Sequence, residues 1–318
     1  MPHAVMEDLK RFGPEQSEAL SEADALAYTR RLASASRENF HVITRLLPAR
    51  LRDDFANTYA FCRWADDLGD EVGDEQTSLR LLQWWDDQLL DCFAGRARHP
   101  VFVALRRTVE RHDLPIAPFR DLLSAFRQDQ HTRRYDSCLQ LLDYCARSAN
   151  PVGRLVLMIC GHREEHLLRL SDATCTGLQF VNFWQDVRRD ASDRGRVYVP
   201  ADVAQRHGLD IDDVIRAVRG SKEAERAIRV PLIETTRELC AWTATFFHEG
   251  RKVLSLVSPD ARPAITLFTL GGEAVLNAVR RRGFDIWTNR PTIGRLGKLR
   301  ILIQAWAAAA MRRTEVVS

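Results

Sequence analysis

Apolar residues recur every three or four positions through most of the chain, which is the pattern of helices that bury one face. Within residues 49–71, "ARLRDDFANTYAFCRWADDLGDE", the residues Leu51, Phe55, Tyr59 and Cys62 follow this spacing. The segments "SLRLLQWWDDQLLDCF" and "CTGLQFVNFWQDVRRD" repeat it. The pattern therefore predicts helices over nearly the whole sequence.

Helix boundaries are marked by capping residues, prolines and glycines. A Ser21-x-x-Asp24 signal is typical of a helix start. The predicted joins lie at Gly73, Gly95, Pro115, Pro118, Gly161, Gly195, Pro200, Gly220 and Pro231. No alternating run is long enough for a sheet, and neither an internal repeat nor a low-complexity linker divides the chain. We expect an all-α protein, folded as a single-domain helical bundle.

Composition adds three constraints on the class of protein. With 318 residues, 45% of them hydrophobic and 28% charged, the chain can bury a sizeable core. A net charge of +3 and the absence of a nucleic-acid-binding module argue against nucleic acid as a partner. The seven scattered cysteines include no C-x-x-C pair, and neither a signal peptide nor a membrane-spanning stretch is evident. We expect a cytoplasmic protein.

The first concentration of acidic residues closes the apolar-aromatic segment "FCRWADDLGDE". Asp66 and Asp70 are four positions apart, so a helix projects them from one face. Two carboxylates about 6 Å apart repel by about 3 kcal/mol at an effective dielectric constant near 20. Inside a cleft that repulsion calls for a cation, and Mg²⁺ is often held by one or two carboxylates together with substrate phosphates.

The second concentration lies in "NFWQDVRRD". Asn182, Asp186 and Asp190 are spaced by four residues and form one stripe of oxygen ligands, with Arg188 on the opposite side of the helix. Either set alone is more often a solvated helix face. Because both sets follow apolar runs, we expect the two helices to face each other at the mouth of an apolar cavity.

Taken together, these segments resemble the squalene/phytoene synthase family over roughly residues 20–285. The resemblance is carried by "RLLPARLRDDFANTYAFCRWADDLGDE", "YCARSANPVGRL" and "LQFVNFWQDVRRDASDRGRVYVP". It implies an isoprenoid-synthase bundle around a central apolar cavity, which uses Mg²⁺ to bind a prenyl diphosphate. Residues 286–318 would form a basic and apolar helical extension packed on the same domain.

The family's roles carry over to matching positions of this sequence. The resemblance implies that metal is bound by Asp66, Asp70, Asn182, Asp186 and Asp190, and that diphosphate is bound by Arg63, Arg196 and Tyr198. It places Tyr59, Tyr144 and Gln179 near the reacting carbons. The two tyrosines also fit ordinary core positions.

Three departures from the common family pattern narrow the choice among the activities of the family. The chain reads "SRENF" before "LLP", "SANPVG" after the tyrosine motif, and Gln185 where an arginine usually precedes the second aspartate pair. In these respects it is most similar to the hydroxysqualene synthases of the bacterial hopanoid pathway. That resemblance implies conversion of presqualene diphosphate and water to hydroxysqualene and diphosphate.

Several alternatives remain open at this stage. One is the head-to-head condensation of two prenyl diphosphates to presqualene diphosphate, squalene or phytoene. Another is a non-catalytic helical partner protein that has kept the fold, and a terpene cyclase is weaker. The basic stretch "AVRRRGFDIWTNRPTIGRLGKLR" fits a solvated face, or else a patch for peripheral contact with the inner membrane surface and with pathway enzymes.

Overall fold

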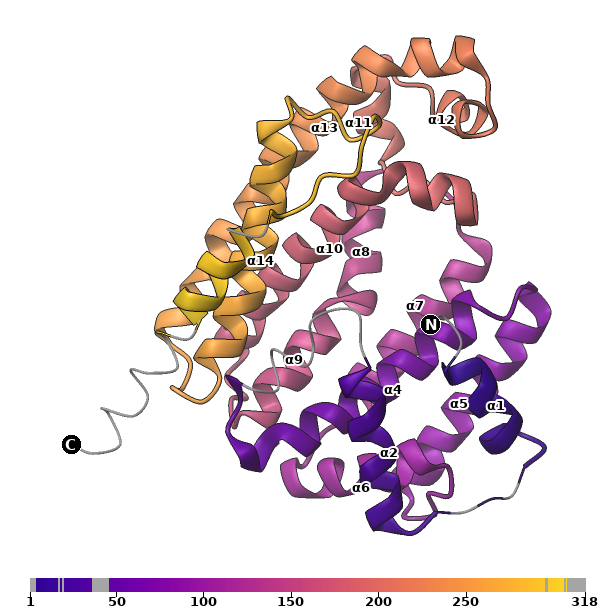
Figure 1. Ribbon diagram of the computed structural model, residues 1–318, viewed down its shortest axis with the longest axis vertical. Coiled ribbons are helices and arrows are strands. Elements are labelled where there is room, and N and C mark those ends of the chain that lie inside the picture. The colour runs from indigo at the N-terminus through magenta and orange to yellow at the C-terminus, as the bar shows by residue number, and fades with distance from the viewer. Residues whose placement is uncertain are drawn as a thin grey trace. The chain divides into compact units, whose positions relative to one another are not determined.

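The computed structural model describes residues 4–16, 18, 20–35, 46–294, 297–305 and 307 (Figure 1). Across these residues the prediction of an all-α protein is confirmed: they contain no β-strand, only an isolated parallel bridge between Arg134 and Val197. The named elements are α1 Ala4–Phe12, α2 Glu22–Ser34, η1 Ala49–Leu51, α4 Arg52–Asp70, α5 Glu75–Phe93, α6 Pro100–His112, α7 Ala117–His131, α8 Cys138–Ser148, α9 Asn150–Ile159, α10 Glu165–Arg194, α11 Ala201–Arg206, α12 Ile211–Val218, α13 Lys222–Gly250, η2 Arg251–Ser255 and α14 Arg262–Arg281.

The helices group into two compact units. The N-terminal unit comprises residues 1–131 and 154–163, and the C-terminal unit comprises residues 132–153 and 164–318. Helix α9 is divided between them, because its first turn belongs to the C-terminal unit. The prediction of one catalytic domain over 20–285 with an extension over 286–318 remains a prediction, and residues 295–296, 306 and 308–318 lie outside the described part.

In the N-terminal unit, α4 is the central helix and packs against α2, α5, α6 and α7. Trp64 on α4 and Trp85 on α5 are fully buried and stack with their ring centroids 5.1 Å apart and their planes 8° apart. The Trp64 indole N–H donates to the Tyr28 hydroxyl on α2 at 3.0 Å. At the start of α2, the Ser21 hydroxyl accepts the Asp24 amide at 3.2 Å, which confirms the predicted cap.

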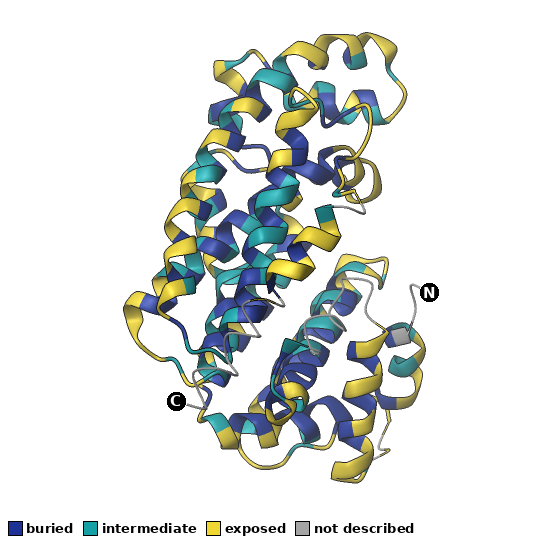
Figure 2. Cartoon of the chain, turned by 60° about the vertical axis from the view of Figure 1, so that its left-hand side comes forward, coloured by how far each residue is buried: buried dark blue, intermediate teal, exposed yellow. Residues whose placement is uncertain are grey.

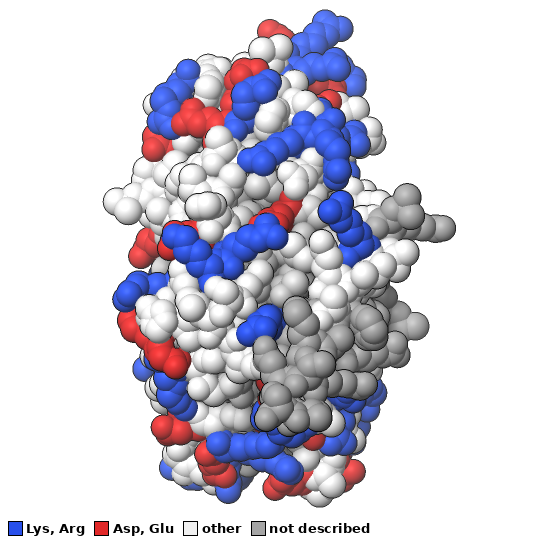
Figure 3. Space-filling model, turned by 90° about the vertical axis from the view of Figure 1, so that its left-hand side faces the viewer, with Lys and Arg blue, Asp and Glu red and all other residues white. Residues whose placement is uncertain are grey.

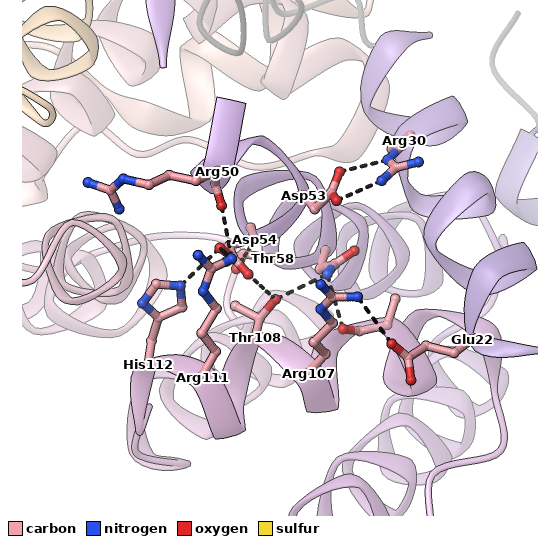
Figure 4. Close-up of polar contacts among 12 residues, drawn as sticks. Glu22, Arg30, Arg50, Asp53, Asp54, Thr58, Arg107, Thr108, Arg111 and His112 are labelled. Atoms are coloured by element: carbon pink, nitrogen blue, oxygen red, sulfur yellow. Dashed lines mark hydrogen bonds and ion pairs between the residues drawn. The ribbon is translucent and has the colours of Figure 1, made fainter. Parts of the chain in front are cut away.

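A buried carboxylate ties the first turn of α4 to the last turn of α6 (Figure 4). Asp54, only 2% exposed, accepts hydrogen bonds from Thr108 Oγ1 at 3.1 Å and Arg111 Nη1 at 3.3 Å, and lies 2.9 Å from His112 Nε2. The Arg111 guanidinium also donates to the Arg50 carbonyl at 2.9 Å. Since a buried carboxylate is costly unless it is paired and hydrogen-bonded, these contacts hold α4 in register on α6.

In the C-terminal unit, the 30-residue helix α10 packs against α8, α12, α13 and α14. Trp184 on α10 donates its indole N–H to Thr243 Oγ1 on α13 at 2.8 Å. Figure 2 shows the long helices with buried residues along one side and exposed residues along the other. Helix α14 approaches α13 closely at Gly272, where an added Cβ would lie 2.5 Å from Phe247 Cζ.

One predicted join is wrong. Pro231 lies inside α13, which continues from Lys222 to Gly250. A proline removes one backbone hydrogen bond from a helix and costs about 3 kcal/mol there. Ile228 and Leu232, on either side of Pro231, are both buried. Packing of this apolar face on neighbouring helices therefore outweighs the local cost.

No helix within the described residues is both long enough and apolar enough to cross a membrane.

Candidate active site

The C-terminal half of α4 carries the first predicted set of site residues. Tyr59, Arg63, Asp66 and Asp70 are all partly exposed. Their spacing of three or four residues places them on one side of the helix, as predicted. The opposite side of α4 is apolar and buried, and it forms the core of the N-terminal unit.

Asp67 has a different role from its acidic neighbours. Its side chain is only 3% exposed and forms an ion pair with Arg63, whose Nη2 lies 2.7 Å from Oδ1. Burial raises the pKa of the Asp67 carboxyl to about 6, and Arg63 opposes that rise. Arg63, predicted to bind diphosphate, thus also holds the acidic end of α4 in place.

The second set lies on α10 as one continuous stripe. Asn182 is exposed, whereas Asp186 and Asp190 are 5% and 7% exposed. Gln179 precedes Asn182 by three residues and extends the stripe by one turn. Burial raises the pKa of the Asp190 carboxyl to about 6, and the neighbouring charge of Asp186 adds to this rise.

Arg290 completes the surroundings of Asp186. Its Nε donates to Asp186 Oδ1 at 2.5 Å, and its Nη2 donates to Asp186 Oδ2 at 3.0 Å and to Gln185 Oε1 at 3.3 Å. The Gln185 amide in turn donates to the Pro291 carbonyl. Sequence reasoning assigned Arg290 only to a basic stretch. No local pattern could have identified its role, because it lies 104 residues from Asp186 in the chain.

Aromatic rings pack behind the α10 stripe. The Tyr198 ring stacks on Phe183 with centroids 4.0 Å apart and an interplanar angle of 10°. Tyr144 packs against both rings, with centroids 6.0–6.1 Å away, and Tyr135 packs against Tyr144 and Tyr198 with centroids 5.5 and 5.6 Å away. The structure therefore brings together two residues predicted separately, Tyr144 and Tyr198, beside Phe183 of α10. Tyr59 and Asp66 belong to the other unit.

The segment after α10 returns along the same unit because Gly195 adopts the left-handed conformation, with φ of 61°. The Arg196 amide then donates to the Asp190 carbonyl at 3.1 Å, and the Arg196 side chain is buried. Val197 donates to the Arg133 carbonyl at 2.9 Å. These bonds hold Arg196 and Tyr198 near the C-terminal end of the stripe, and their role in binding diphosphate stays a prediction.

The donor set fits a hard divalent cation whose remaining ligands come from elsewhere. In the described part of the chain, no three or more His, Cys, Asp or Glu side chains are grouped so as to hold a metal ion. Each predicted set does contain two carboxylates, and the second adds the amide oxygen of Asn182. Oxygen-only ligands in such small number suit an ion that is also bound by substrate phosphates.

Comparison with known proteins places this fold and these motifs in one family. The family model described as "Squalene/phytoene synthase" matches residues 9–297, and the chain belongs to this family. Synthases of this family process prenyl diphosphates and generally use a divalent metal.

Individual relatives carry more than one activity in their names. A hydroxysqualene synthase from Rhodopseudomonas palustris is 35% identical over 216 residues, which cover 67% of this chain and 69% of that protein. A phytoene synthase from Arthrospira platensis is 27% identical, with coverage of 84% and 88%. The crystal structure of the squalene synthase HpnC from Alicyclobacillus acidocaldarius matches with 39% identity and a TM-score of 0.76, covering 84% of this chain and 97% of that one.

Proposed function

We propose that this protein converts presqualene diphosphate and water to hydroxysqualene and diphosphate, with Mg²⁺ as its cofactor. The observation that carries the proposal is the Asn182–Asp186–Asp190 stripe, whose two aspartates are buried, in a chain that is 35% identical over 216 residues to a hydroxysqualene synthase. The phytoene synthase from Arthrospira platensis is less identical to this chain, at 27%.

Each predicted residue is assigned a role in this reaction. Asp66, Asp70, Asn182, Asp186 and Asp190 would hold Mg²⁺, which when bound neutralises the charge of the leaving diphosphate. Arg63 and Arg196 donate charge-assisted hydrogen bonds to the diphosphate oxygens, and Tyr198 binds at the same end. These groups stabilise the charge that develops as the carbon–oxygen bond breaks.

Loss of diphosphate leaves a cyclopropylcarbinyl cation, which rearranges before water is added. Aromatic faces stabilise such a cation, and apolar walls exclude bulk water while it rearranges. Tyr59, Tyr144 and Gln179 would then position a single water. Its oxygen bonds to the carbocation, and its extra proton leaves with diphosphate.

Gln185 distinguishes this proposal from condensation of two diphosphates. Its amide bonds both Arg290 and the Pro291 carbonyl, so this buried side chain fastens the 285–291 segment to α10 without adding a positive charge. A site with one arginine fewer is suited to one diphosphate instead of two. Condensation of two prenyl diphosphates remains the second candidate, favoured by the phytoene synthase relative that covers 84% of this chain.

The deciding experiment supplies the purified protein with Mg²⁺ and either farnesyl diphosphate alone or presqualene diphosphate alone. We expect hydroxysqualene from the second substrate and no product from the first. Presqualene diphosphate formed from farnesyl diphosphate alone would establish the condensing activity instead. A protein that releases no diphosphate under either condition, and whose Asp66→Ala and Asp186→Ala variants keep its biological role, would be a non-catalytic partner.

Peripheral contact with an anionic membrane surface is a further part of the proposal. In the helical segment 297–305, Leu299 and Ile303 lie one turn apart and are 54% and 57% exposed, next to exposed Lys298 and Arg300. Exposed apolar side chains flanked by cations are typical of helices that rest on anionic lipid. Leu299→Ser with Ile303→Ser should abolish sedimentation with phosphatidylglycerol vesicles. Unchanged sedimentation would contradict this contact.

A further inference from the structure

A hollow lies within the C-terminal unit, and none of the aspartates of the stripe lines it. It has a volume of about 370 Å³. Its walls come from α10, from the N-terminal half of α13 and from residues 284–288, and they include Arg188, Lys222, Glu225, Arg226, Arg229 and Trp287. Pockets that bind small molecules begin at about this size. Nothing in the proposed reaction uses it.

The two acidic side chains of this pocket are already satisfied by their neighbours. Glu225 accepts from Lys222 Nζ at 3.0 Å and from the Trp287 indole N–H at 3.4 Å. Asp285 accepts the backbone N–H groups of Trp287 and Thr288, both at 3.0 Å, and the Thr288 hydroxyl at 2.7 Å. Hydrogen bonding of this kind lowers the pKa of both carboxyl groups. Both therefore stay charged, and their oxygens already accept hydrogen bonds from these neighbours.

The three arginines of the pocket form no close ion pair with a described residue, although the charges of Arg188 and Arg229 help to lower the pKa of Glu225 and of Asp285. Within the described residues, none of Arg188, Arg226 and Arg229 has a carboxylate oxygen within 4.0 Å. The Arg188 guanidinium instead lies over the Trp287 ring, 5.4 Å from its centroid, and donates to the Trp287 carbonyl at 3.2 Å. Arg226 and Arg229 are exposed at the pocket. Figure 3 shows several Lys and Arg side chains close together near the upper end of the face that it draws. The α13 label of Figure 1 is at the same height.

Below these cations the pocket is apolar. Leu232 and Ile286 are 2% and 3% exposed, and Trp287 is 8% exposed. A ligand that fits both parts has a multiply charged head and a small organic body. One guanidinium group can bind two phosphate oxygens at once. Several guanidinium groups together therefore fit a ligand with two or three negative charges better than they fit a single carboxylate.

The pocket and the aspartate stripe open on different sides of α10. Successive residues of an α-helix are separated by about 100°, so Arg188 projects about 200° away from Asp186. A ligand in the pocket would therefore not be bound by the stripe. The inference that follows does not depend on the proposed reaction.

We propose that the pocket formed by α10, α13 and residues 284–288 binds a phosphate-class anion, either a soluble organic phosphate or diphosphate or the phosphate of a lipid headgroup. Arg188, Arg226 and Arg229 bind the phosphate oxygens. The apolar floor contacts the organic part of the ligand.

The first test uses the full-length protein in EDTA, so that diphosphate held through a divalent metal does not contribute. Inorganic diphosphate is titrated in by calorimetry, and tryptophan fluorescence is followed in parallel. We expect saturable binding that weakens at least tenfold in Arg226→Ser/Arg229→Ser. It should stay within twofold in Arg80→Ser/Arg169→Ser, a control that removes two exposed arginines elsewhere. The fluorescence change should disappear in Trp287→Phe.

The second test distinguishes the source of the phosphate. The same variants are sedimented with phosphatidylglycerol vesicles and with phosphatidylcholine vesicles. Tenfold weaker binding of Arg226→Ser/Arg229→Ser to phosphatidylglycerol would assign the site to a lipid headgroup, and unchanged vesicle binding with weakened diphosphate binding would assign it to a soluble ligand. If Arg226→Ser/Arg229→Ser matches Arg80→Ser/Arg169→Ser in both assays, the pocket is no anion site. Neither assay measures turnover, so such a failure leaves the proposed reaction to be judged by its own experiment.

Discussion

The two helices that carry the aspartates, α4 and α10, stabilise their acidic ends by different means. On α4 the buried acid is Asp67, and its partner Arg63 is one turn away on the same helix. On α10 the buried acids are Asp186 and Asp190. Asp186, a predicted metal ligand, pairs with Arg189 on the same helix at 3.0 Å and also with Arg290, which comes from a segment 104 residues further on. The α4 pair is local to one helix, whereas the Arg290 contact on α10 exists only after the chain has folded.

The aromatic rings behind the two motifs differ in the same way. Trp64 on α4 packs against Trp85 and His99 in the interior of the N-terminal unit, and Phe61 stacks on Trp85. Phe183 on α10 instead stacks on Tyr198, and two more tyrosines are close by. The first cluster holds a helix in position, while the second gathers three tyrosines around a ring of the helix that carries the oxygen ligands.

The largest effect should come from the predicted metal ligands. Asp66→Asn and Asp186→Asn should each lower the rate of Mg²⁺-dependent diphosphate release by about a hundred- to a thousandfold, because each removes a charged oxygen ligand. Steady-state assays of diphosphate release measure this effect. Asp87→Asn and Asp193→Asn, at exposed positions, serve as controls. Full activity in either ligand variant would remove that helix from the proposed site.

The sealed cluster behind α4 should respond in stability. Trp64→Ala should lower the free energy of unfolding by about 3–5 kcal/mol, because it leaves a cavity among fully buried rings. Urea denaturation measures this loss. Val230→Ala, at a position 68% exposed, should change the free energy by less than about 0.5 kcal/mol. A similar small change in Trp64→Ala would show that the cluster does not hold α4.

His99 makes the same cluster sensitive to pH. Its Nδ1 accepts the Val101 amide at 3.2 Å at the start of α6, and burial lowers the pKa of the imidazole to about 3. The unfolded chain therefore binds a proton below pH 6.5 that the folded chain does not bind. The stability contributed by neutral His99 is complete above pH 6.5 and is lost as the pH falls toward 3.

Between pH 7 and pH 5 this difference amounts to about 2 kcal/mol of unfolding free energy. His99→Asn keeps a side-chain acceptor for the cap but cannot be protonated, and asparagine is a favourable capping residue. We expect the wild-type protein to lose about 2 kcal/mol more than His99→Asn over this interval, as measured by urea denaturation at each pH. Parallel losses in the two proteins would contradict a buried neutral imidazole.

The smallest effect contrasts the two ion pairs directly. Arg290→Ala and Arg63→Ala should each cost about 1–2 kcal/mol, since both arginines are partly exposed and each leaves a buried carboxylate with fewer partners. Only Arg290→Ala should also speed amide hydrogen exchange in residues 285–294, because Arg290 fastens that segment to α10. Equal exchange in both variants would mean that Gln185 alone holds the segment.

Much of the fold and of the candidate site could be predicted from the local spacing of residues. The three- and four-residue recurrence of apolar positions predicted the helices, and the same periodicity put Asp66 with Asp70 and Asn182 with Asp186 and Asp190 on common faces. These relations hold within one helix, where residue separation alone decides which side chains are neighbours. Pro231 escaped this reasoning because a local penalty of about 3 kcal/mol was offset by packing of the whole helix.

The helical class, the family and the predicted site residues all followed from the amino-acid sequence. The pairing of Arg290 with Asp186, the aromatic cluster of Tyr144, Tyr198 and Phe183, and the separate pocket lined by Arg188 and Trp287 became visible only in the folded chain. Each of these contacts joins residues far apart in the chain. Their partners are selected by the packing of whole helices, which no short segment encodes.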